Sequence, residues 1–391
     1  MPDVLKIAAW LLQVLLGYNL VLPFFLYLAY LFRSKRKAAV VEVGLEPDYA
    51  VIVTAYEQTH TLPPVIQSLL QLDYTNYHIY IVADKCDVSN LSFGDGRVTV
   101  LRPPETLASN TRSHFYAINH FHRQHERLTI IDSDNLVESD YLRRLNPFFA
   151  QGFNAVQGVR KAKNTDTVYA SLDAARDLYY HFYDGEVLFR LGSSATLAGS
   201  GMAFTVDLYK SCLGHLDLSG AGFDKVLQYQ ILSRNDRIAF AEEAVVYDEK
   251  TARTDQLVNQ RARWINTWFR YFAYGFTLLK KGVVNGSWNQ FLFGLILLRP
   301  PLFIFLLLSM LCLLVNLWVS PITALVWGIA FLLFVAGFFV ALAHAKAETK
   351  IYKAMLRAPL FIFYQVLSLR KVRNANKHSV ATKHSFGSGE K

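Results

Sequence analysis

Three long apolar segments dominate the pattern of hydrophobic and polar positions along the chain. Residues 5–32 carry a single charge, Lys6, whereas residues 302–320 and 322–343 carry none. At about 1.5 Å per helical residue, each segment can cross a hydrocarbon layer of roughly 30 Å. We predict one transmembrane helix at the N-terminus and a transmembrane hairpin that turns at Pro321. A cleaved signal peptide is the alternative for the first segment, although it would normally have a shorter apolar core and a small-residue cleavage site.

Between the first two apolar segments, the pattern changes to short strands separated by helical runs. The strands are rich in β-branched and aromatic residues, and the intervening runs have apolar residues at helical spacing. Strands that alternate with helices predict an α/β domain on a Rossmann-like, mostly parallel sheet. The expected strands are 48–56, 78–84, 97–101 and 127–132, and the expected helices include 62–72, 112–123 and 166–189.

Two further segments are apolar in part. Residues 269–301 mix aromatic, basic and apolar residues at helix-like spacing, which is typical of amphipathic helices on a membrane surface. Residues 358–369 are apolar but too few to cross a bilayer, so they are also expected at the interface. The chain therefore divides into a first helix with a basic segment, an α/β domain, an interfacial region, a hairpin and a tail. Their ranges are 1–37, 48–257, 258–301, 302–345 and 346–391.

The charge distribution orients these parts. The net charge is +9, and basic residues cluster beside the spans at 33–37 and 346–353 and in the tail at 369–384. This placement favours anionic membrane lipids as partners and argues against nucleic acid. By the positive-inside rule, the basic segments and the α/β domain lie in the cytoplasm and the N-terminus lies outside. The chain is thus expected to be an integral protein of the plasma or inner membrane.

The cysteines add little chemistry. Cys86, Cys212 and Cys312 are scattered without the paired spacing of a zinc site or a disulfide framework. Reduced thiols are consistent with a cytoplasmic domain.

Polar residues close three of the expected strands. In a parallel doubly wound sheet, ligands bind beyond the carboxyl ends of the strands, so these residues are candidate ligand contacts. They are Tyr56, Glu57 and Gln58 after the first strand, Asp84 and Asp87 after the second, and Asp132 and Asp134 after the fourth.

Asp132 and Asp134 form a D-x-D motif, which suits a hard divalent cation. Two carboxylates two residues apart after a buried strand can face one cleft. An Asx-turn or a helix N-cap is the alternative for a motif this short. The position after a buried strand favours the metal site.

Two later segments offer further candidates. Gly199, Ser200 and Gly201 lie in a stretch whose backbone can approach a ligand closely, although a tight turn would also explain the glycines. Asp224 opens an expected helix. It is either an N-cap or a general base that points into the cleft.

The segment 258–268, VNQRARWINTW, has two interpretations. Arginine and tryptophan collect at the headgroup layer of membranes, so the segment could be an anchor. An arginine fork also suits diphosphate oxygens, and a tryptophan face suits a pyranose ring. We assign the second role to Arg263 and Trp264, and leave Trp268 and Arg270 as anchors.

The order of these segments resembles that of family 2 glycosyltransferases, specifically the membrane-integrated synthases related to cellulose, chitin and hyaluronan synthases. The resemblance covers residues 48–270 and rests on six motifs in the family's order. They are VIVTAYEQ, VADKCDVS, DSD, AGSGMAF, FDKVLQ and QRARW. The sequence departs from the family pattern at four places: Glu57 and Gln58 stand for an asparagine-glutamate pair, His114 for a lysine and Phe223 for a glutamate, and no glycine follows QRARW.

This resemblance implies a GT-A fold and transfer of a sugar from a nucleoside diphosphate sugar, usually a UDP-sugar, with inversion of configuration. It implies Mg²⁺ or Mn²⁺ at Asp132 and Asp134, with Asp224 as the base that deprotonates the acceptor. The implied contacts of the nucleotide sugar are Ala55, Tyr56, Glu57, Gln58, Asp84, Asp132, Asp134, Gln260, Arg261 and Arg263. The implied acceptor contacts are Gly199, Ser200, Gly201 and Trp264.

We predict that the acceptor is a growing glycan, and a lipid that receives a single sugar is the alternative. The QRARW motif favours a polysaccharide or oligosaccharide synthase. Three spans are few to enclose a translocation channel, which favours single transfer to a lipid, or else a homo-oligomer. A non-catalytic membrane scaffold with the same fold is a third hypothesis, and the retained carboxylates argue against it.

Overall fold

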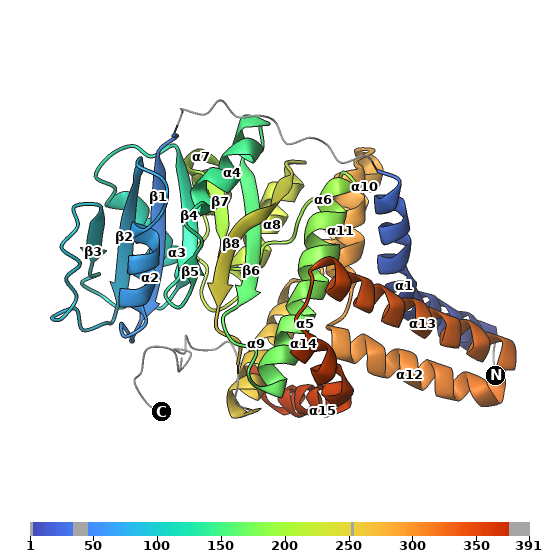
Figure 1. The fold of residues 1–391 in the computed structure, drawn as a ribbon. Helices are drawn as coiled ribbons and strands as arrows, with labels where there is room; N and C mark the ends of the chain where they lie inside the picture. Colours follow the sequence, from blue (N-terminus) through green and yellow to red (C-terminus); the bar gives the residue numbers. More distant parts are fainter. Residues whose placement is uncertain (1–2, 34–45, 252–253, 375–391) are drawn as a thin grey trace.

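An eight-stranded sheet forms the centre of the α/β domain in the computed structural model, which describes residues 3–33, 46–251 and 254–374. Its strand order is β3-β2-β1-β4-β7-β6-β8-β5 (Figure 1). The strands are β1 (Tyr49–Tyr56), β2 (Tyr77–Asp84), β3 (Val98–Leu101), β4 (Arg127–Asp132), β5 (Leu136–Val137), β6 (Ala155–Ala162), β7 (Met202–Thr205) and β8 (Ile238–Asp248).

The sheet is mixed. β1 pairs in parallel with β2 and β4, and β6 pairs in parallel with β8. β7 runs antiparallel to both β4 and β6, and β5 runs antiparallel to β8. The expectation of a parallel sheet therefore describes β1 to β4, the strands that the sequence pattern located. It missed β5, β6, β7 and β8, and with them the antiparallel pairings of the sheet.

Both faces of the sheet are covered, which explains its nearly continuous apolar strands. Alternate residues of β1 enter two different cores: Ala50 and Ile52 pack with one cluster, and Val51 and Val53 pack with the other. The first core includes α3 (Asn110–Asn119), α7 (Val206–Leu213) and α8 (Phe223–Ser233). The second includes α2 (Leu62–Leu70) and α4 (Tyr141–Ala150).

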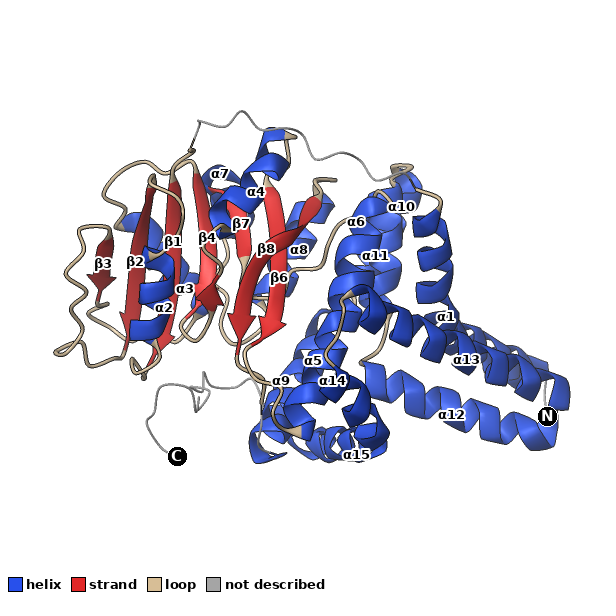
Figure 2. Cartoon of the chain, in the orientation of Figure 1, coloured by secondary structure: helices blue, strands red, loops and turns tan. Residues whose placement is uncertain are grey.

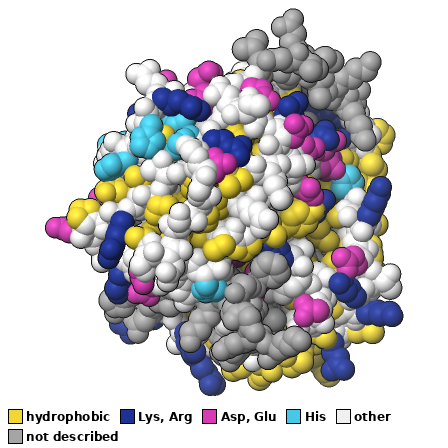
Figure 3. All heavy atoms as spheres, turned by 60° about the vertical axis from the view of Figure 1, so that its left-hand side comes forward, with side chains coloured by type: hydrophobic (Ala, Val, Ile, Leu, Met, Phe, Trp, Pro, Cys, Tyr) yellow, Lys and Arg dark blue, Asp and Glu magenta, His cyan; other side chains and the backbone are white. Residues whose placement is uncertain are grey.

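Three helices among the described residues are long and apolar enough to cross a membrane: α1 (Asp3–Leu31), α12 (Leu302–Val319) and α13 (Pro321–His344). They pack against one another and project from one side of the α/β domain (Figure 1). Many large apolar side chains of α12 are exposed, among them Leu311 and Leu317. The opposite side of the molecule instead carries interspersed acidic and basic side chains (Figure 3).

A helical layer lies between the sheet and the three apolar helices (Figure 2). Its first part is continuous: α5 (Val168–Tyr180), a π-helix η1 (His181–Val187) and α6 (Leu188–Arg190). Its second part comprises α9 (Thr254–Tyr271), α10 (Tyr274–Val284) and α11 (Trp288–Leu298). The C-terminal part comprises α14 (Thr349–Ala354), η2 (Met355–Arg357), α15 (Ala358–Ser368) and η3 (Leu369–Asn374).

The C-terminal helices pack against α9, which carries the whole of residues 258–268. Val372 accepts a hydrogen bond from the Asn266 side chain, and Phe361 lies against the Arg261 guanidinium. Most of the basic segment 33–37 and the end of the tail 369–384 lie outside the described residues.

Candidate active site

One cavity of about 710 Å³ collects most of the polar residues that the sequence singled out. It lies beyond the carboxyl ends of β1, β4 and β8 and is closed by α5, α8 and α9. Ten predicted site residues line it: Tyr56, Gln58, Asp132, Asp134, Gly199, Asp224, Gln260, Arg261, Arg263 and Trp264. Five do not line it: Ala55, Glu57, Asp84, Ser200 and Gly201.

Two of these five residues, Asp84 and Ser200, hold backbone segments near the cavity. The Asp84 carboxylate is buried and accepts the backbone N–H groups of Leu107 and Ala108 at 2.9 and 2.7 Å, so it organises the loop before α3. The Ser200 hydroxyl accepts the backbone N–H of Asp132 at 3.0 Å. It therefore fixes the backbone at the start of the D-x-D motif.

Glu57 turns away from the cavity. Its backbone is left-handed, with φ +60°, and its carboxylate pairs with the exposed Lys85 at 2.7 Å. A contact of Glu57 with the base of a nucleotide stays a prediction.

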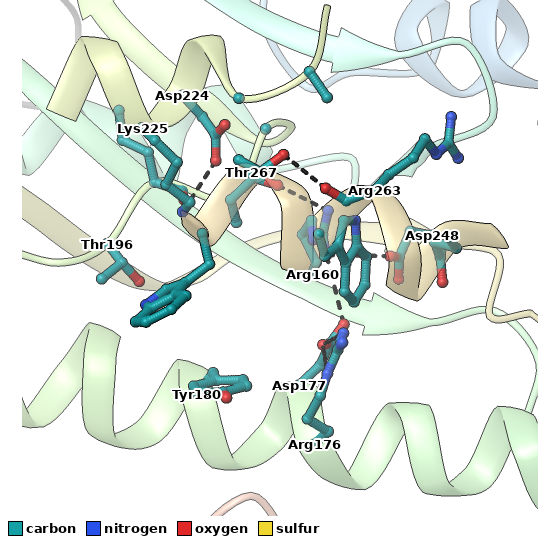
Figure 4. Close-up of a pocket in the computed structure, with 18 of the residues that line it drawn as sticks. Arg160, Arg176, Asp177, Tyr180, Thr196, Asp224, Lys225, Asp248, Arg263 and Thr267 are labelled. Atoms are coloured by element: carbon teal, nitrogen blue, oxygen red, sulfur yellow. Dashed lines mark hydrogen bonds and ion pairs between the residues drawn. The ribbon is translucent and has the colours of Figure 1, made fainter. Parts of the chain in front are cut away.

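The D-x-D carboxylates face a partly buried arginine, Arg160 of β6. Burial disfavours its charged form, but the carboxylates of Asp248, Asp177, Asp132 and Asp134 outweigh burial and raise the pKa of Arg160. Its guanidinium lies 3.5 Å from Asp177 and 3.7 Å from Asp248. Figure 4 shows these three side chains together on one side of the cavity. Arg160 thus compensates part of the negative charge that the carboxylates bring to the site.

A second buried cation, Lys250, completes this group. Its ammonium pairs with Asp177 and with Asp248, the latter at 2.7 Å. Burial lowers the pKa of Lys250, but the two carboxylates outweigh that effect and raise it. The ammonium is therefore charged at neutral pH, and its two ion pairs hold β8 against α5.

The QRARW residues on α9 have different surroundings. Arg261 is 3% exposed and forms a buried ion pair with Asp173 of α5. Its guanidinium lies over the Trp264 ring, 4.2 Å from the centroid, and the Arg176 guanidinium lies over that ring at the same distance. Gln260 accepts a hydrogen bond from the Thr251 hydroxyl at 3.2 Å.

Arg263 lines the cavity in a partly buried position, and burial lowers its pKa. It nevertheless remains a cation at neutral pH, because the pKa of arginine starts far above 7. The two guanidinium groups therefore have different surroundings. That of Arg263 lies at the cavity wall, and that of Arg261 is bound to Asp173.

Asp224 lies in the first turn of α8. Its carboxylate lies 3.1 Å from the Lys225 ammonium, which also donates to the backbone carbonyl of Leu197 at 3.0 Å (Figure 4). The residue before α8, Gly222, has φ +101°, and a Cβ there would lie 2.6 Å from Tyr271 and 2.7 Å from Thr267. Glycine thus allows the start of α8 to lie directly against α9.

The family described as "Glycosyltransferase like family 2" matches residues 47–267, which is more than half of the chain. The chain belongs to this glycosyltransferase family.

One solved structure supports the fold of this glycosyltransferase. A mannosyltransferase from Pyrobaculum calidifontis, PcManGT, in complex with GDP-Man and Mn²⁺, matches with a TM-score of 0.56 and 15% identity, over 92% of this chain and 97% of that one. TarS of S. aureus in complex with UDP matches with a TM-score of 0.41 and 14% identity, over 59% of this chain and 65% of that one. No curated protein matches the chain. The fold is therefore the GT-A type, with a mixed sheet.

Two of the positions that differ from the motifs the sequence resembles are in contact. The rings of His114 and Phe223 lie 5.1 Å apart, and His114 Nδ1 is 2.7 Å from the Tyr209 hydroxyl. Burial lowers the pKa of His114 to about 3, so it is neutral. A lysine and a glutamate are thus replaced together by a neutral, tightly packed pair.

The sequence-based candidates left out several charged residues of the glycosyltransferase site, among them Arg160, Asp173, Asp177 and Lys250. Lys250 follows β8 just as Asp134 follows β4, so the rule of polar residues after strand ends would have located it. The rule could be applied only if β8 were recognised as a strand. It would also have to be known that the chain after β8 faces α5. No local signal marks Asp173 and Asp177, since a helix of this composition is equally consistent with exposed carboxylates.

Proposed function

We propose that this glycosyltransferase uses a nucleoside diphosphate sugar, a UDP-sugar, to glycosylate an acceptor held at the membrane, with inversion at the anomeric carbon. One observation carries the proposal: a single cavity brings Asp132 and Asp134, Asp224 and the QRARW side chains together from β4, α8 and α9. These elements are far apart in the sequence. Their convergence in one cavity is what a transferase with separate donor and acceptor groups requires.

The D-x-D carboxylates fit a divalent cation. Asp132 and Asp134 both line the cavity and offer hard oxygen ligands of the kind that Mg²⁺ and Mn²⁺ prefer. Arg160 offsets only part of the surrounding negative charge, which comes also from Asp177 and Asp248. When bound there, such a cation would neutralise the charge of the diphosphate leaving group. The Mn²⁺ and GDP-Man of the mannosyltransferase structure support a metal-dependent donor site of this type.

Two arginines would have different roles near the donor. Arg263, at the cavity wall, is assigned to the diphosphate, because its guanidinium can form paired hydrogen bonds with phosphate oxygens. Arg261 is assigned to positioning, since its guanidinium is bound to Asp173 and lies over Trp264. Trp264, which is 38% exposed, would then meet the acceptor with the part of its indole that the two guanidinium groups leave uncovered.

Asp224 would act as the base. It takes the proton from an acceptor hydroxyl while that oxygen forms a bond to the anomeric carbon and the bond from that carbon to the diphosphate oxygen breaks. Attack opposite the leaving group inverts the configuration. The Lys225 ammonium lies 3.1 Å from the carboxylate that would take this proton.

The lining of the same cavity supports an acceptor site at the membrane. Its wall includes Ile296 and Leu297 of α11 and continues through Arg299 to Leu302 at the start of α12. With the basic segments on the cytoplasmic side, the α/β domain would lie in the cytoplasm and the N-terminus outside. This continuity with α12 favours an acceptor carried by a lipid. The alternative is extension of a glycan, as the resemblance to the synthases implies. It rests on the QRARW motif and would call for a homo-oligomer to enclose a channel.

The test is an assay of the full chain in lipid nanodiscs with radiolabelled UDP-sugars, with GDP-mannose in the same panel because of the mannosyltransferase fold. We expect turnover of one donor, loss of activity in EDTA and recovery with excess Mg²⁺ or Mn²⁺. Labelled product that stays lipid-sized under excess donor supports transfer to a lipid, whereas product that lengthens supports the synthase. Turnover that survives EDTA would contradict the metal role of Asp134, and no turnover with any donor would contradict the function.

A further inference from the structure

The cavity has a second polar group at its membrane end, which none of the sequence motifs includes. Arg299, directly before Pro300 and α12, forms a buried ion pair with Asp184 of the π-helix η1. Arg299 is 9% exposed and Asp184 is 5% exposed, and both residues line the cavity. The Arg299 guanidinium lies 5.2 Å from the centroid of the Tyr180 ring, which lines the cavity as well.

The hydrogen bonding of this pair is incomplete. Arg299 Nη1 and Asp184 Oδ1 are both buried, and neither has a partner among the residues that the structure describes. A buried donor or acceptor without a partner is costly, and native proteins rarely leave one in place without a reason. Here one unmatched donor and one unmatched acceptor belong to the same ion pair. The group that satisfies both is one that accepts and donates, as a hydroxyl does.

The charge of the pair points to the same chemistry. Arg299 is neutralised by Asp184, so the subsite presents no excess positive charge to an anion. An ionised phosphate offers only acceptors and would meet the Asp184 carboxylate, which repels it. A neutral polyol meets neither obstacle.

The surroundings of the pair are apolar. Ile296, Leu297, Pro300, Pro301, Leu302 and Phe303 line the cavity on both sides of Arg299. On α12 beyond them, Leu307, Leu308 and Leu311 are exposed, by 44%, 40% and 57%. An apolar chain that leaves the cavity along α12 would therefore stay in contact with apolar side chains and reach the hydrocarbon layer.

We infer that Arg299 and Asp184 form the headgroup subsite for a lipid acceptor whose headgroup is a sugar or another neutral polyol. This inference rests on the proposed function, because it names the class of acceptor for the same cavity. The π-helix contributes directly, since its residue Asp184 enters the cavity while Glu186, two residues on, binds Tyr30 of α1 and His344 of α13. One irregular helix therefore connects the headgroup subsite to two of the three apolar helices. Segments of this kind often occur at functional sites.

The test is photolabelling of the full chain in nanodiscs with a decyl β-glucoside that carries a diazirine beside the sugar. We expect the label in the peptide that contains residues 296–303, with competition by decyl β-glucoside and at least tenfold weaker competition by decyl phosphate. Arg299→Gln and the isosteric Asp184→Asn should each reduce labelling at least fivefold. The matched control is Arg190→Gln. Arg190 forms an ion pair with Glu186 of η1, and both residues lie outside the cavity, so this variant should leave labelling unchanged.

The outcomes separate the subsite from the proposed function. Equal or stronger competition by decyl phosphate, or undiminished labelling in both variants, would overturn the polyol subsite. Calorimetric titration of UDP and GDP with Mn²⁺ is measured on the same samples and should be unchanged within twofold in every variant. If the wild type bound neither nucleotide, the proposed function would fail, whereas the labelling result would stand by itself. Should Arg299→Gln lower the thermal midpoint by more than a few degrees, Arg299→Lys and Asp184→Asn decide the question.

Discussion

The guanidinium of Arg261 lies 4.2 Å from the centroid of the Trp264 ring, and its charge is neutralised by Asp173. Two residues of the QRARW motif are thus bound to each other and, through Asp173, to α5. Because α5 also carries Asp177, the partner of Arg160 and Lys250, the motif on α9 and the strand ends on β6 and β8 are held by a single helix. The relative placement of the donor and acceptor groups therefore depends on α5.

The first prediction concerns Asp173. Asp173→Asn leaves the Arg261 guanidinium buried without its counter-charge, so the free energy of unfolding should fall by about 3 kcal/mol. Chemical denaturation in detergent measures this. The double variant Asp173→Asn with Arg261→Gln should recover at least about 1 kcal/mol, since it no longer buries an unpaired charge. Strictly additive losses would show that the two side chains are not coupled.

Asp224→Asn tests the proposed base. The variant keeps the size of the side chain but cannot accept a proton, so kcat should fall roughly 10²–10⁴-fold while nucleotide affinity stays within twofold. Asp207→Asn is the matched control, because Asp207 also lies in the first turn of a helix, α7, but is exposed outside the cavity. A kcat of Asp224→Asn within threefold of the wild type would exclude Asp224 as base.

His114 predicts a pH dependence of stability. Burial lowers its pKa from 6.5 to about 3, so the folded chain binds fewer protons than the unfolded chain between these values. Stability is therefore complete above pH 6.5 and falls as the pH decreases, by about 1.4 kcal/mol per unit. Thermal midpoints between pH 7 and pH 5 should decrease more steeply in the wild type than in His114→Gln. Parallel profiles would show that His114 does not titrate with unfolding.

Gly222→Ala should disturb the contact between α8 and α9. A Cβ at this position meets Tyr271 and Thr267 at 2.6 and 2.7 Å, and φ is +101°. We expect a loss of about 2 kcal/mol or more from strain and overlap, together with lower kcat from displacement of Asp224. Gly94→Ala is the control, because Gly94 also has a positive φ but nothing within 4 Å of the added Cβ. It should cost only about 1–2 kcal/mol of strain and leave kcat unchanged. Equal effects of the two variants would contradict the packing argument.

The sequence alone determined the features that repeat along short stretches. The three apolar helices, the strands β1 to β4 and the polar residues that close them follow from local periodicity, because burial on both faces or in lipid leaves a continuous pattern. The order of six short motifs was also enough to assign the family, which the match over residues 47–267 shows.

The tertiary structure decided which of those residues share the cavity and which partners they have. The sequence around Trp264 and Arg261 is the same whether these residues anchor the chain or line a site. Only the packing of α9 against α5 brings Asp173 to Arg261. From the sequence, Arg299 is likewise an interfacial arginine before a membrane span. Only the structure shows that Asp184 of η1 lies beside it. The physical reason is that ion pairs and cavities join residues far apart in the chain. Their charges and volumes match only after the layers have packed, and no local period records that match.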